Sequence, residues 1–339
     1  MRIKLHPPQA IFELGHRSNQ EDSIFPELGQ ATQDDRLFVL CDGMGGHERG
    51  EVASSAVCQG LSKYFNDNIK NDKILSDSQL QDALEYAYRY LDEKDNGEFH
   101  KAGTTMTLLY FHRGGCTAAH IGDSRIYHFR PSSRSVLYKS RDHSLVFELY
   151  QAGEISYQEM KTHPRKNQVT KAMIAGKENR QRMDIVHIAD ILPDDYFFIC
   201  SDGILEHLDD EELLDLLVTN DNDEQKKQKL MELTDGNADN HSAYLIHIGD
   251  VLKEDGDEML LNDEQQVRFN AVHINPVLQT DNDIKIMAEE VLEKEMTQYQ
   301  PTSLSKSRNL IKKHIVWLLI GILCVLATIA TLLVTFICN

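Results

Sequence analysis

Acidic residues, most of them beside glycine, arginine or asparagine, stand at several separated places along this chain of 339 residues. These places are Glu21-Asp22, Asp42-Gly43, Gly122-Asp123-Ser124-Arg125, Asp202-Gly203 and Asp239-Asn240. Carboxylates brought together at one point disfavour each other's ionisation unless a cation compensates their charge. The donors are hard oxygens without Cys or His at zinc spacing, a set that favours magnesium or manganese over zinc or copper. We therefore expect a divalent-metal site.

Apolar runs of strand length should position three of these acidic groups. Leu37–Cys41 precedes Asp42, Cys116–Ile121 precedes Gly122-Asp123, and Tyr196–Cys200 precedes Ser201-Asp202. We expect each carboxylate to lie at the end of a buried strand, and neighbouring strands would bring the carboxylates together. Gly43 has no side chain, so its backbone carbonyl can also approach an ion.

The surrounding pattern is that of an α/β protein. Small and apolar residues at three- and four-residue steps predict helices over Val52–Phe65 and Leu80–Leu91. Thr104–Phe111 and Tyr244–Ile248 are typical of strands. The acidic residues Asp209–Glu212 before an apolar run predict a capped helix start, and we expect Arg125 to form a structural salt bridge.

Taken in order, these segments resemble the motifs of the metal-dependent type 2C protein phosphatases, the PPM family. The matching segments are Gly15–Asp22, Asp42–His47, Gly103–Thr105, Gly122–Arg125, Ser201–Gly203 and Asp239-Asn240. Asp142–Leu145 and Asn167–Ala172 resemble the bacterial branch, in which the segment between them forms a flap beside the active site. The resemblance implies a four-layer α-β-β-α sandwich of two antiparallel sheets flanked by helices, with the metal site at one end.

The resemblance also implies a set of metal ligands around two Mn²⁺ or Mg²⁺ ions. Asp42 would bridge the ions, Asp202 and Asp239 would complete one shell, and the Gly43 carbonyl and Glu21 would serve the other. A water between the ions would lose its proton and attack phosphorus. A third, weakly bound ion is implied at Asp123 together with Asp202.

Two further residues receive roles in catalysis. Arg17 would bind the phosphate through its planar guanidinium, and Asp22 would hydrogen-bond water on the ions. The position after Asp42-Gly43, where eukaryotic relatives carry a histidine proposed as general acid, is Met44 here. His47 is a candidate general acid, and a water on the third ion is an alternative donor.

The second strong signal lies in residues 315–337, which contain no charged residue. As a helix they would extend about 34 Å, enough to cross a hydrocarbon core of about 30 Å. Trp317 near the start and the basic segment 304–314 before it predict a single-pass C-terminal membrane anchor with the catalytic part in the cytoplasm. The domain boundaries that follow are 1–250 for the catalytic domain, 251–303 for an extension and spacer, 304–314 for the juxtamembrane segment and 315–337 for the transmembrane helix.

Composition narrows the class of partner. The net charge of −19 argues against binding to nucleic acid, whereas the basic juxtamembrane segment suits anionic lipid. Six cysteines without close-spaced pairs agree with a reducing compartment, and Met1–Ala10 contains no apolar signal-peptide region.

We therefore expect a membrane-tethered, metal-dependent phosphatase for phosphoserine and phosphothreonine in proteins, with a membrane serine/threonine kinase or the targets of that kinase as candidate substrates. Two alternatives remain open: a pseudophosphatase that binds phosphoproteins without turnover, and a membrane anchor whose globular part docks a partner. A phosphatase with an aspartyl-phosphate intermediate fits poorly, because no Asp-x-Asp motif follows the early strands.

Overall fold

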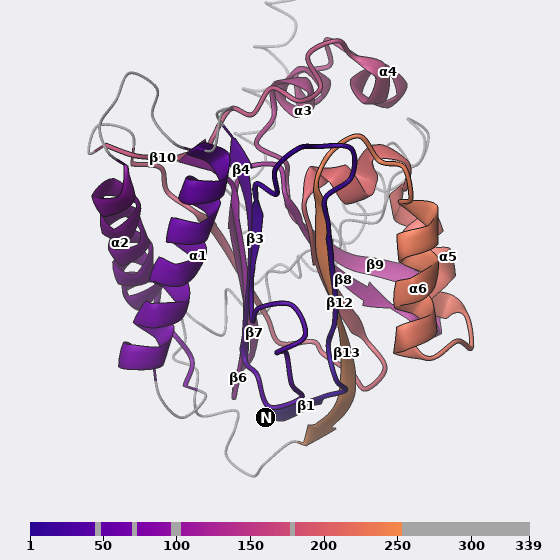
Figure 1. Cartoon of the computed structure of the whole chain (residues 1–339). Helices are drawn as coiled ribbons and strands as arrows, with labels where there is room; N and C mark the ends of the chain where they lie inside the picture. The colour runs from indigo at the N-terminus through magenta and orange to yellow at the C-terminus, as the bar shows by residue number, and fades with distance from the viewer. Residues whose placement is uncertain (45–48, 70–72, 96–102, 177–179, 253–339) are drawn as a thin grey trace, which may run out of the picture. The chain divides into compact units, whose positions relative to one another are not determined.

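Two antiparallel β-sheets stack face to face, and helices cover the outer face of each (Figure 1). The computed structural model describes residues 1–44, 49–69, 73–95, 103–176 and 180–252. The elements described here belong to one unit, Met1–Val277. Their layers form the expected α-β-β-α sandwich.

The first sheet contains seven strands. Their order is β10 (Met173–Ile174), β5 (Gly103–Thr104), β4 (Leu37–Met44), β6 (Met106–His112), β7 (Gly115–Ile121) and β11 (Asp184–Ile188), and β3 (Asp22–Phe25) also pairs with β4. Helices α1 (Arg49–Asn68) and α2 (Asp77–Lys94) pack on its outer face (Figure 1). A Cβ on Gly60 of α1 would lie 2.9 Å from the Cα of Ala87, so glycine permits the close approach of the two helices.

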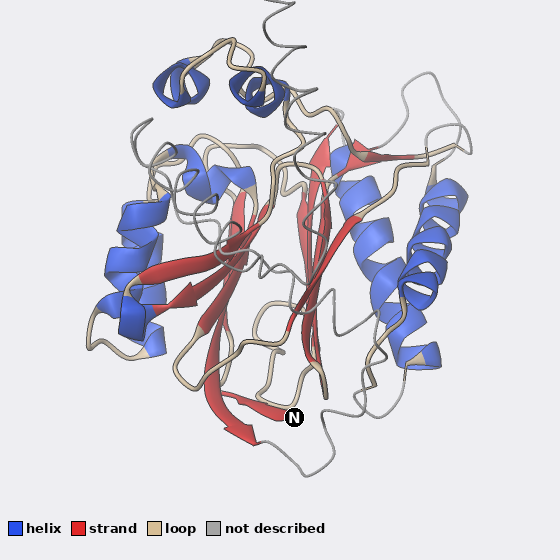
Figure 2. Ribbon diagram, turned by 180° about the vertical axis from the view of Figure 1, so that it is seen from behind, coloured by secondary structure: helices blue, strands red, loops and turns tan. Residues whose placement is uncertain are grey.

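The second sheet contains six strands. Their order is β1 (Arg2–Leu5), β13 (His241–Leu252), β12 (Tyr196–Cys200), β8 (Arg125–Arg130) and β9 (Ser135–Lys139), and β2 (Gln9–Glu13) also pairs with β13. Helices α5 (Asp210–Val218) and α6 (Asp223–Leu233) cover its outer face, opposite α1 and α2 in the view from behind (Figure 2). The short 3₁₀ segments η1 (Pro131–Ser133) and η3 (Asp202–Glu206) follow β8 and β12.

Three apolar clusters fill the spaces between these four layers. The central cluster lies between the sheets, where Phe111 of β6 meets Phe38 of β4 and Phe197 of β12 edge to face. Phe111 and Phe38 belong to the first sheet and Phe197 to the second, so this contact packs the two sheets against each other. Helices α3 (Leu145–Gln151) and α4 (Tyr157–Thr162) form the flap at one end (Figure 1).

Within residues 1–252 the expected helices and strands are present, and two details differ from the sequence interpretation. Strand β4 continues to Met44, so Asp42 lies inside the strand instead of following it. The run Thr104–Phe111 is divided at Thr105, which separates β5 from β6. The N–H of Thr105 donates to the carbonyl of Asp42 (2.8 Å), and this bond carries the pairing across the break.

The predictions for the C-terminal part concern residues outside the described ranges. These are the extension and spacer beyond Leu252, the basic segment 304–314 and the membrane helix 315–337. Among the described residues, no helix combines the length and apolar character needed to span a bilayer. Strand β13 carries the sandwich two residues past the predicted boundary at 250.

Candidate active site

Strands β3 and β4 place the carboxyl groups of Asp22 and Asp42 opposite each other across an antiparallel pair. Only 3% of Asp22 is exposed, and its Oδ2 accepts a hydrogen bond from Ser201 Oγ (2.9 Å). Ser201 precedes Asp202 and is itself held by the N–H of Ser242 (2.9 Å). The two sheets are therefore joined at the site by a buried Ser-Asp contact.

Five aspartates share this end of the sandwich, and four of them have a raised pKa. Burial raises the pKa of Asp42 well above its usual range, and the charges of Asp22, Asp202, Asp123 and Asp239 raise it further. Burial raises the pKa of Asp22 to about 7, and burial together with Asp239 raises that of Asp202 to about 6. Burial and the charge of Asp202 likewise raise the pKa of Asp123. The structure thus brings together every aspartate that the sequence singled out for this site.

Glu21 and Gly43 meet beside the start of α1. The N–H of Gly43 donates to the carbonyl of Glu21 (3.0 Å). A Cβ on Gly43 would lie 2.2 Å from the carbonyl oxygen of Gly50, and a Cβ on Gly50 would lie 2.9 Å from the Glu21 carboxyl. No side chain fits at either glycine, so this close packing of backbone holds the Glu21 carboxyl next to the Gly43 peptide. Burial raises the pKa of Glu21, while Arg17 opposes that change.

Arg17 lies at the rim of the site. Its Nη2 donates to Asp239 Oδ2 (2.7 Å), and this bond raises the pKa of the guanidinium. About half of the Arg17 side chain, 53%, is exposed, so the group can also meet a ligand from solvent. Gly15 positions the same loop: it has a φ of +61°, and a Cβ there would lie 2.1 Å from the carbonyl oxygen of Asp239.

The donor set fits divalent cations of the hard type. Asp22 Oδ1 is buried and has no hydrogen-bond partner among the described residues, and the charge of Asp202 raises the pKa of the Asp42 carboxyl. Carboxylates so close together remain ionised only when a cation offsets their charge. Oxygen-only donors of this kind match magnesium or manganese.

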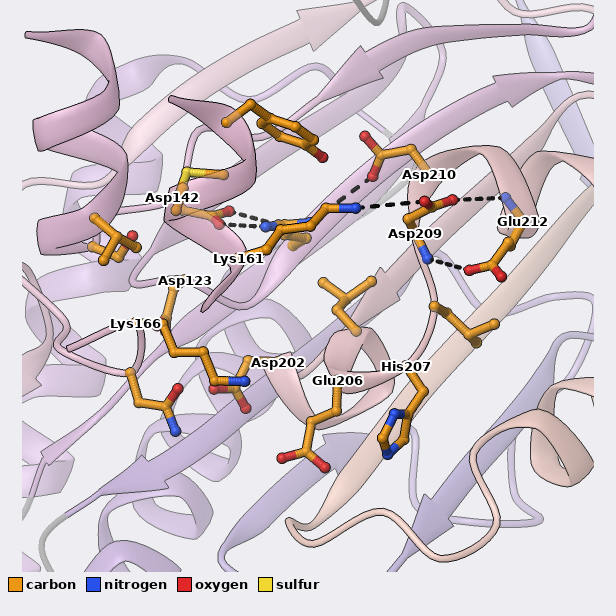
Figure 3. A pocket seen from close by; sticks show the side chains of 18 residues that line it. Asp123, Asp142, Lys161, Lys166, Asp202, Glu206, His207, Asp209, Asp210 and Glu212 are labelled. Carbon is orange, nitrogen blue, oxygen red and sulfur yellow. Dashed lines mark hydrogen bonds and ion pairs between the residues drawn. The ribbon is translucent and has the colours of Figure 1, made fainter. Parts of the chain in front are cut away.

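A cavity of about 410 Å³ opens beside Asp123 and Asp202, between the flap and the segment from η3 to α5. Figure 3 shows Lys161 and Lys166 of the flap and Glu206 and Asp209 on the opposite wall. Asp142 forms a bidentate ion pair with Arg125 (2.7 and 2.6 Å). The expected structural salt bridge of Arg125 is therefore confirmed.

A second group of candidate ligands consists of His120, His143 and Asp184, whose ligand atoms lie within 4.8 Å of one another. The hydrogen bonding speaks against a metal here. His143 Nδ1 accepts the N–H of Gly122 (3.0 Å), so a neutral ring carries its proton on Nε2 and offers no free lone pair. The ammonium of Lys171 also lies 3.2 Å from Nε2, where it supplies a positive charge beside Asp184.

Several residues that support the site were not identified as such from the sequence. Asn240 Nδ2 donates to the carbonyls of Leu14 and Asn19 (2.8 and 3.0 Å), and its Oδ1 accepts the N–H of Glu21 (2.8 Å). Its place directly after Asp239 was a signal for this bracing role. Ser201 lies in the Ser201–Gly203 motif and had the same kind of signal, whereas Ser242 had none, because serine beside a strand is common. Met44 ends β4, and His47 lies outside the described residues.

Comparison with known proteins gives matches over the same part of the chain. Residues 15–235 match the family model described as Protein phosphatase 2C. A putative protein phosphatase 2C-type from Streptococcus pyogenes is 31% identical over 240 residues, which cover 68% of this chain and 92% of that protein.

Solved structures agree with this match. The serine/threonine phosphatase Stp1 from Staphylococcus aureus is 31% identical with a TM-score of 0.60, covering 71% of this chain and 94% of that one. The catalytic domain of the serine threonine protein phosphatase PstP, in complex with two manganese ions, is 26% identical with a TM-score of 0.58, covering 74% and 100%.

Proposed function

Because this chain belongs to the protein phosphatase 2C family and is a bacterial-type serine/threonine protein phosphatase, we propose that it works with two manganese or magnesium ions held by its buried carboxylates. The observation that carries the proposal is that Asp22, Asp42 and Asp202 lie close together. Asp22 and Asp42 belong to strands β3 and β4 of the first sheet, and Asp202 follows β12 of the second sheet. Burial and the neighbouring carboxylates raise the pKa of all three groups, and bound divalent cations would offset the charge that this arrangement concentrates.

The residues around Asp42 would share the two ions. Asp42 would contact both, Asp202 and Asp239 would hold one, and Glu21 with the Gly43 carbonyl would hold the other. When bound, such ions supply a water that loses its proton near neutral pH and a positive field for the phosphoryl oxygens. A weaker third ion would be held by Asp123 and Asp202.

The protein's own groups would orient the substrate. Arg17 is held by Asp239 yet half exposed, so its guanidinium can donate hydrogen bonds to two phosphate oxygens at the mouth of the site. Asp22, held by Ser201, lies behind Asp42 and would orient water by accepting its hydrogen bonds. The phosphoprotein would approach along the cavity beneath the flap.

The test is hydrolysis of a phosphothreonine peptide by the full chain with manganese, with and without excess chelator. We expect turnover only with the metal, and a loss of at least about a thousandfold in Asp42→Asn, because a ligand of both ions is weakened. Asp34→Asn, in an exposed loop, is the matched control and should keep full activity. Binding of the peptide without turnover would favour a pseudophosphatase, and intact turnover in Asp42→Asn would refute the assigned site.

We also propose that the protein is tethered to a membrane with its catalytic part in the cytoplasm. The support is the uncharged stretch 315–337 preceded by Lys306, Arg308, Lys312 and Lys313. A tether raises the effective concentration of the phosphatase for membrane-bound phosphoproteins, among them a membrane serine/threonine kinase and the targets of that kinase. Protease protection of the C-terminal segment in sealed vesicles, with cleavage of the rest from the cytoplasmic side only, tests this topology.

A further inference from the structure

His143 lies where the turn carrying Asp123 meets the base of the flap. The backbone N–H of His143 donates to the carbonyl of Gly122 (3.0 Å). The ring Nδ1 of His143 accepts a hydrogen bond from the backbone N–H of Gly122 (3.0 Å). His143 therefore binds both backbone polar groups of Gly122, the residue that precedes Asp123. On the other side, His143 Nε2 faces Asp184 Oδ2 (3.1 Å).

The hydrogen bonds define the state of the ring. Because Nδ1 accepts a backbone N–H, the single proton of a neutral imidazole sits on Nε2 and points to Asp184. Only 3% of the His143 side chain is exposed, and the ring of His120 stacks on it at 4.8 Å with an angle of 5° between the planes. His120 Nε2 in turn contacts the carbonyl of Arg141 (2.8 Å), so the stacked ring is anchored as well.

The turn itself needs such support. Gly122 has a φ of +110°, and a Cβ there would lie 2.6 Å from Thr105 Cγ2, so the turn is both left-handed and crowded. Asp123 beyond it is 8% exposed, and its carboxyl lies near those of Asp202 and Asp42. When ionised, these carboxylates would repel one another, and the bonds from His143 to Gly122 would oppose a displacement of the Asp123 turn.

The same residue closes the flap. The carbonyl of His143 accepts the N–H of Thr170 (2.8 Å), and Ser144 forms an antiparallel bridge with Val169. The N–H of Leu145 donates to the carbonyl of Gln168 (2.8 Å). Both ends of the flap, with α3 and α4 between them, are thus fastened directly beside the Asp123 turn.

We propose that His143, oriented by Asp184, is a positioning residue that fixes the Gly122-Asp123 turn against the base of the flap and so sets the Asp123 carboxylate for cation binding. The inference rests on the proposed function. It goes beyond that function because it gives His143, which would contact neither substrate nor metal, the role of fixing the position of the Asp123 carboxyl.

Two substitutions separate the contacts of the ring. His143→Asn keeps an acceptor near the position of Nδ1 and can still receive the N–H of Gly122, whereas it loses Asp184. His143→Gln keeps a donor near the position of Nε2 for Asp184 and loses the acceptor for Gly122. The matched control is His112→Gln: His112 Nδ1 accepts the N–H of Gly114 (3.0 Å) and Nε2 contacts Thr117 (2.8 Å) at the opposite end of β7.

The first measurement is hydrogen exchange of the Gly122 amide in the metal-free full chain. We expect His143→Gln to accelerate this exchange by about tenfold or more, because the buried donor loses its acceptor, and His143→Asn to keep it close to wild type. His112→Gln should leave Gly122 unchanged. Unchanged protection of Gly122 in His143→Gln would overturn the proposal.

The second measurement is calorimetric titration with manganese alone. The weakest resolved manganese affinity should fall about tenfold in His143→Gln and stay within about twofold in His143→Asn and in His112→Gln. Equal losses in His143→Gln and His112→Gln would mean general destabilisation and would overturn the proposal. Because neither measurement uses phosphate turnover, failure of the proposed enzymatic activity would be seen separately, in the wild-type peptide assay.

Discussion

The carboxyl of Asp22 shows how burial sets the charge of this site at the scale of a single residue. Its pKa lies at about 7, raised first by burial and then by the charges of Asp202 and Asp239, while the hydroxyls of Ser242 and Ser201 oppose the change. In the unfolded chain the same group would titrate near 4. The folded, metal-free protein therefore favours protonated Asp22.

This difference predicts a pH dependence of stability in the metal-free protein. Because the pKa of Asp22 is higher in the folded than in the unfolded protein, its contribution to stability is fully present below about pH 4. This contribution is lost as the pH rises through about 7 and the folded protein must ionise Asp22. Asp202, at about 6, acts in the same direction. In chelator, the free energy of unfolding should fall by on the order of 3 kcal/mol between pH 4.5 and 8.

Asp22→Asn supplies the comparison for this prediction. The amide is neutral at every pH, so urea unfolding of this variant in chelator should show a clearly flatter pH profile than wild type. A wild-type free energy of unfolding that rises over this pH range would contradict the assignment. Saturating manganese should raise stability most at high pH, where the carboxylates are ionised.

At the scale of elements, two helices with the same type of cap are expected to respond differently to its loss. Ser76 caps α2 and Ser156 caps α4, each in a reciprocal box with Gln79 or Glu159. Helix α2 buries an apolar face on the first sheet, whereas α4 in the flap buries none of its residues. Replacing the capping serine by alanine therefore tests the stability of the core in α2 and the stability of the flap in α4.

Ser76→Ala should lower the free energy of global unfolding by about 1 kcal/mol. Ser156→Ala should leave global unfolding unchanged within about 0.3 kcal/mol, because α4 adds little to the core, yet it should speed amide exchange in Tyr157–Thr162. Urea denaturation and hydrogen exchange measure the two effects. Equal destabilisation by both substitutions would show that the flap folds as part of the core.

At the scale of the whole molecule, the sequence combines a net charge of −19 with the uncharged, apolar stretch 315–337. We expect the charged part to favour water and the apolar stretch to favour a bilayer. From this charge we predict that the protein does not bind nucleic acid. The apolar stretch would need a bilayer, and the basic residues before it would face anionic lipid.

The proposed membrane tether gives a prediction of its own. Replacing Val325 and Leu326 near the centre of the stretch by arginine should cost insertion about 3 kcal/mol or more per residue and move the protein from the membrane to the soluble fraction. Activity on a soluble phosphopeptide should stay unchanged, since the substitutions lie far along the chain from the site residues. Wild-type protein found entirely in the soluble fraction would contradict the tether.

The sequence by itself determined the components of this protein. Apolar runs marked β7 and β12, and helical periodicity marked α1 and α2. Acidic residues next to glycine, asparagine or another acid marked the candidate metal ligands. Each of these signals is local in the chain. The order of the motifs indicated the family and the two-sheet architecture.

Only the tertiary structure decided how the components meet. It placed Asp42 inside β4 opposite Asp22 and formed the hydrogen bond from Ser201 to the Asp22 carboxyl. It also formed the hydrogen bonds by which Asn240 holds Leu14 and His143 holds Gly122. These contacts join residues up to 226 positions apart. No periodicity encodes such a pairing, because it depends on how two sheets pack and on which buried polar atoms then remain to be satisfied.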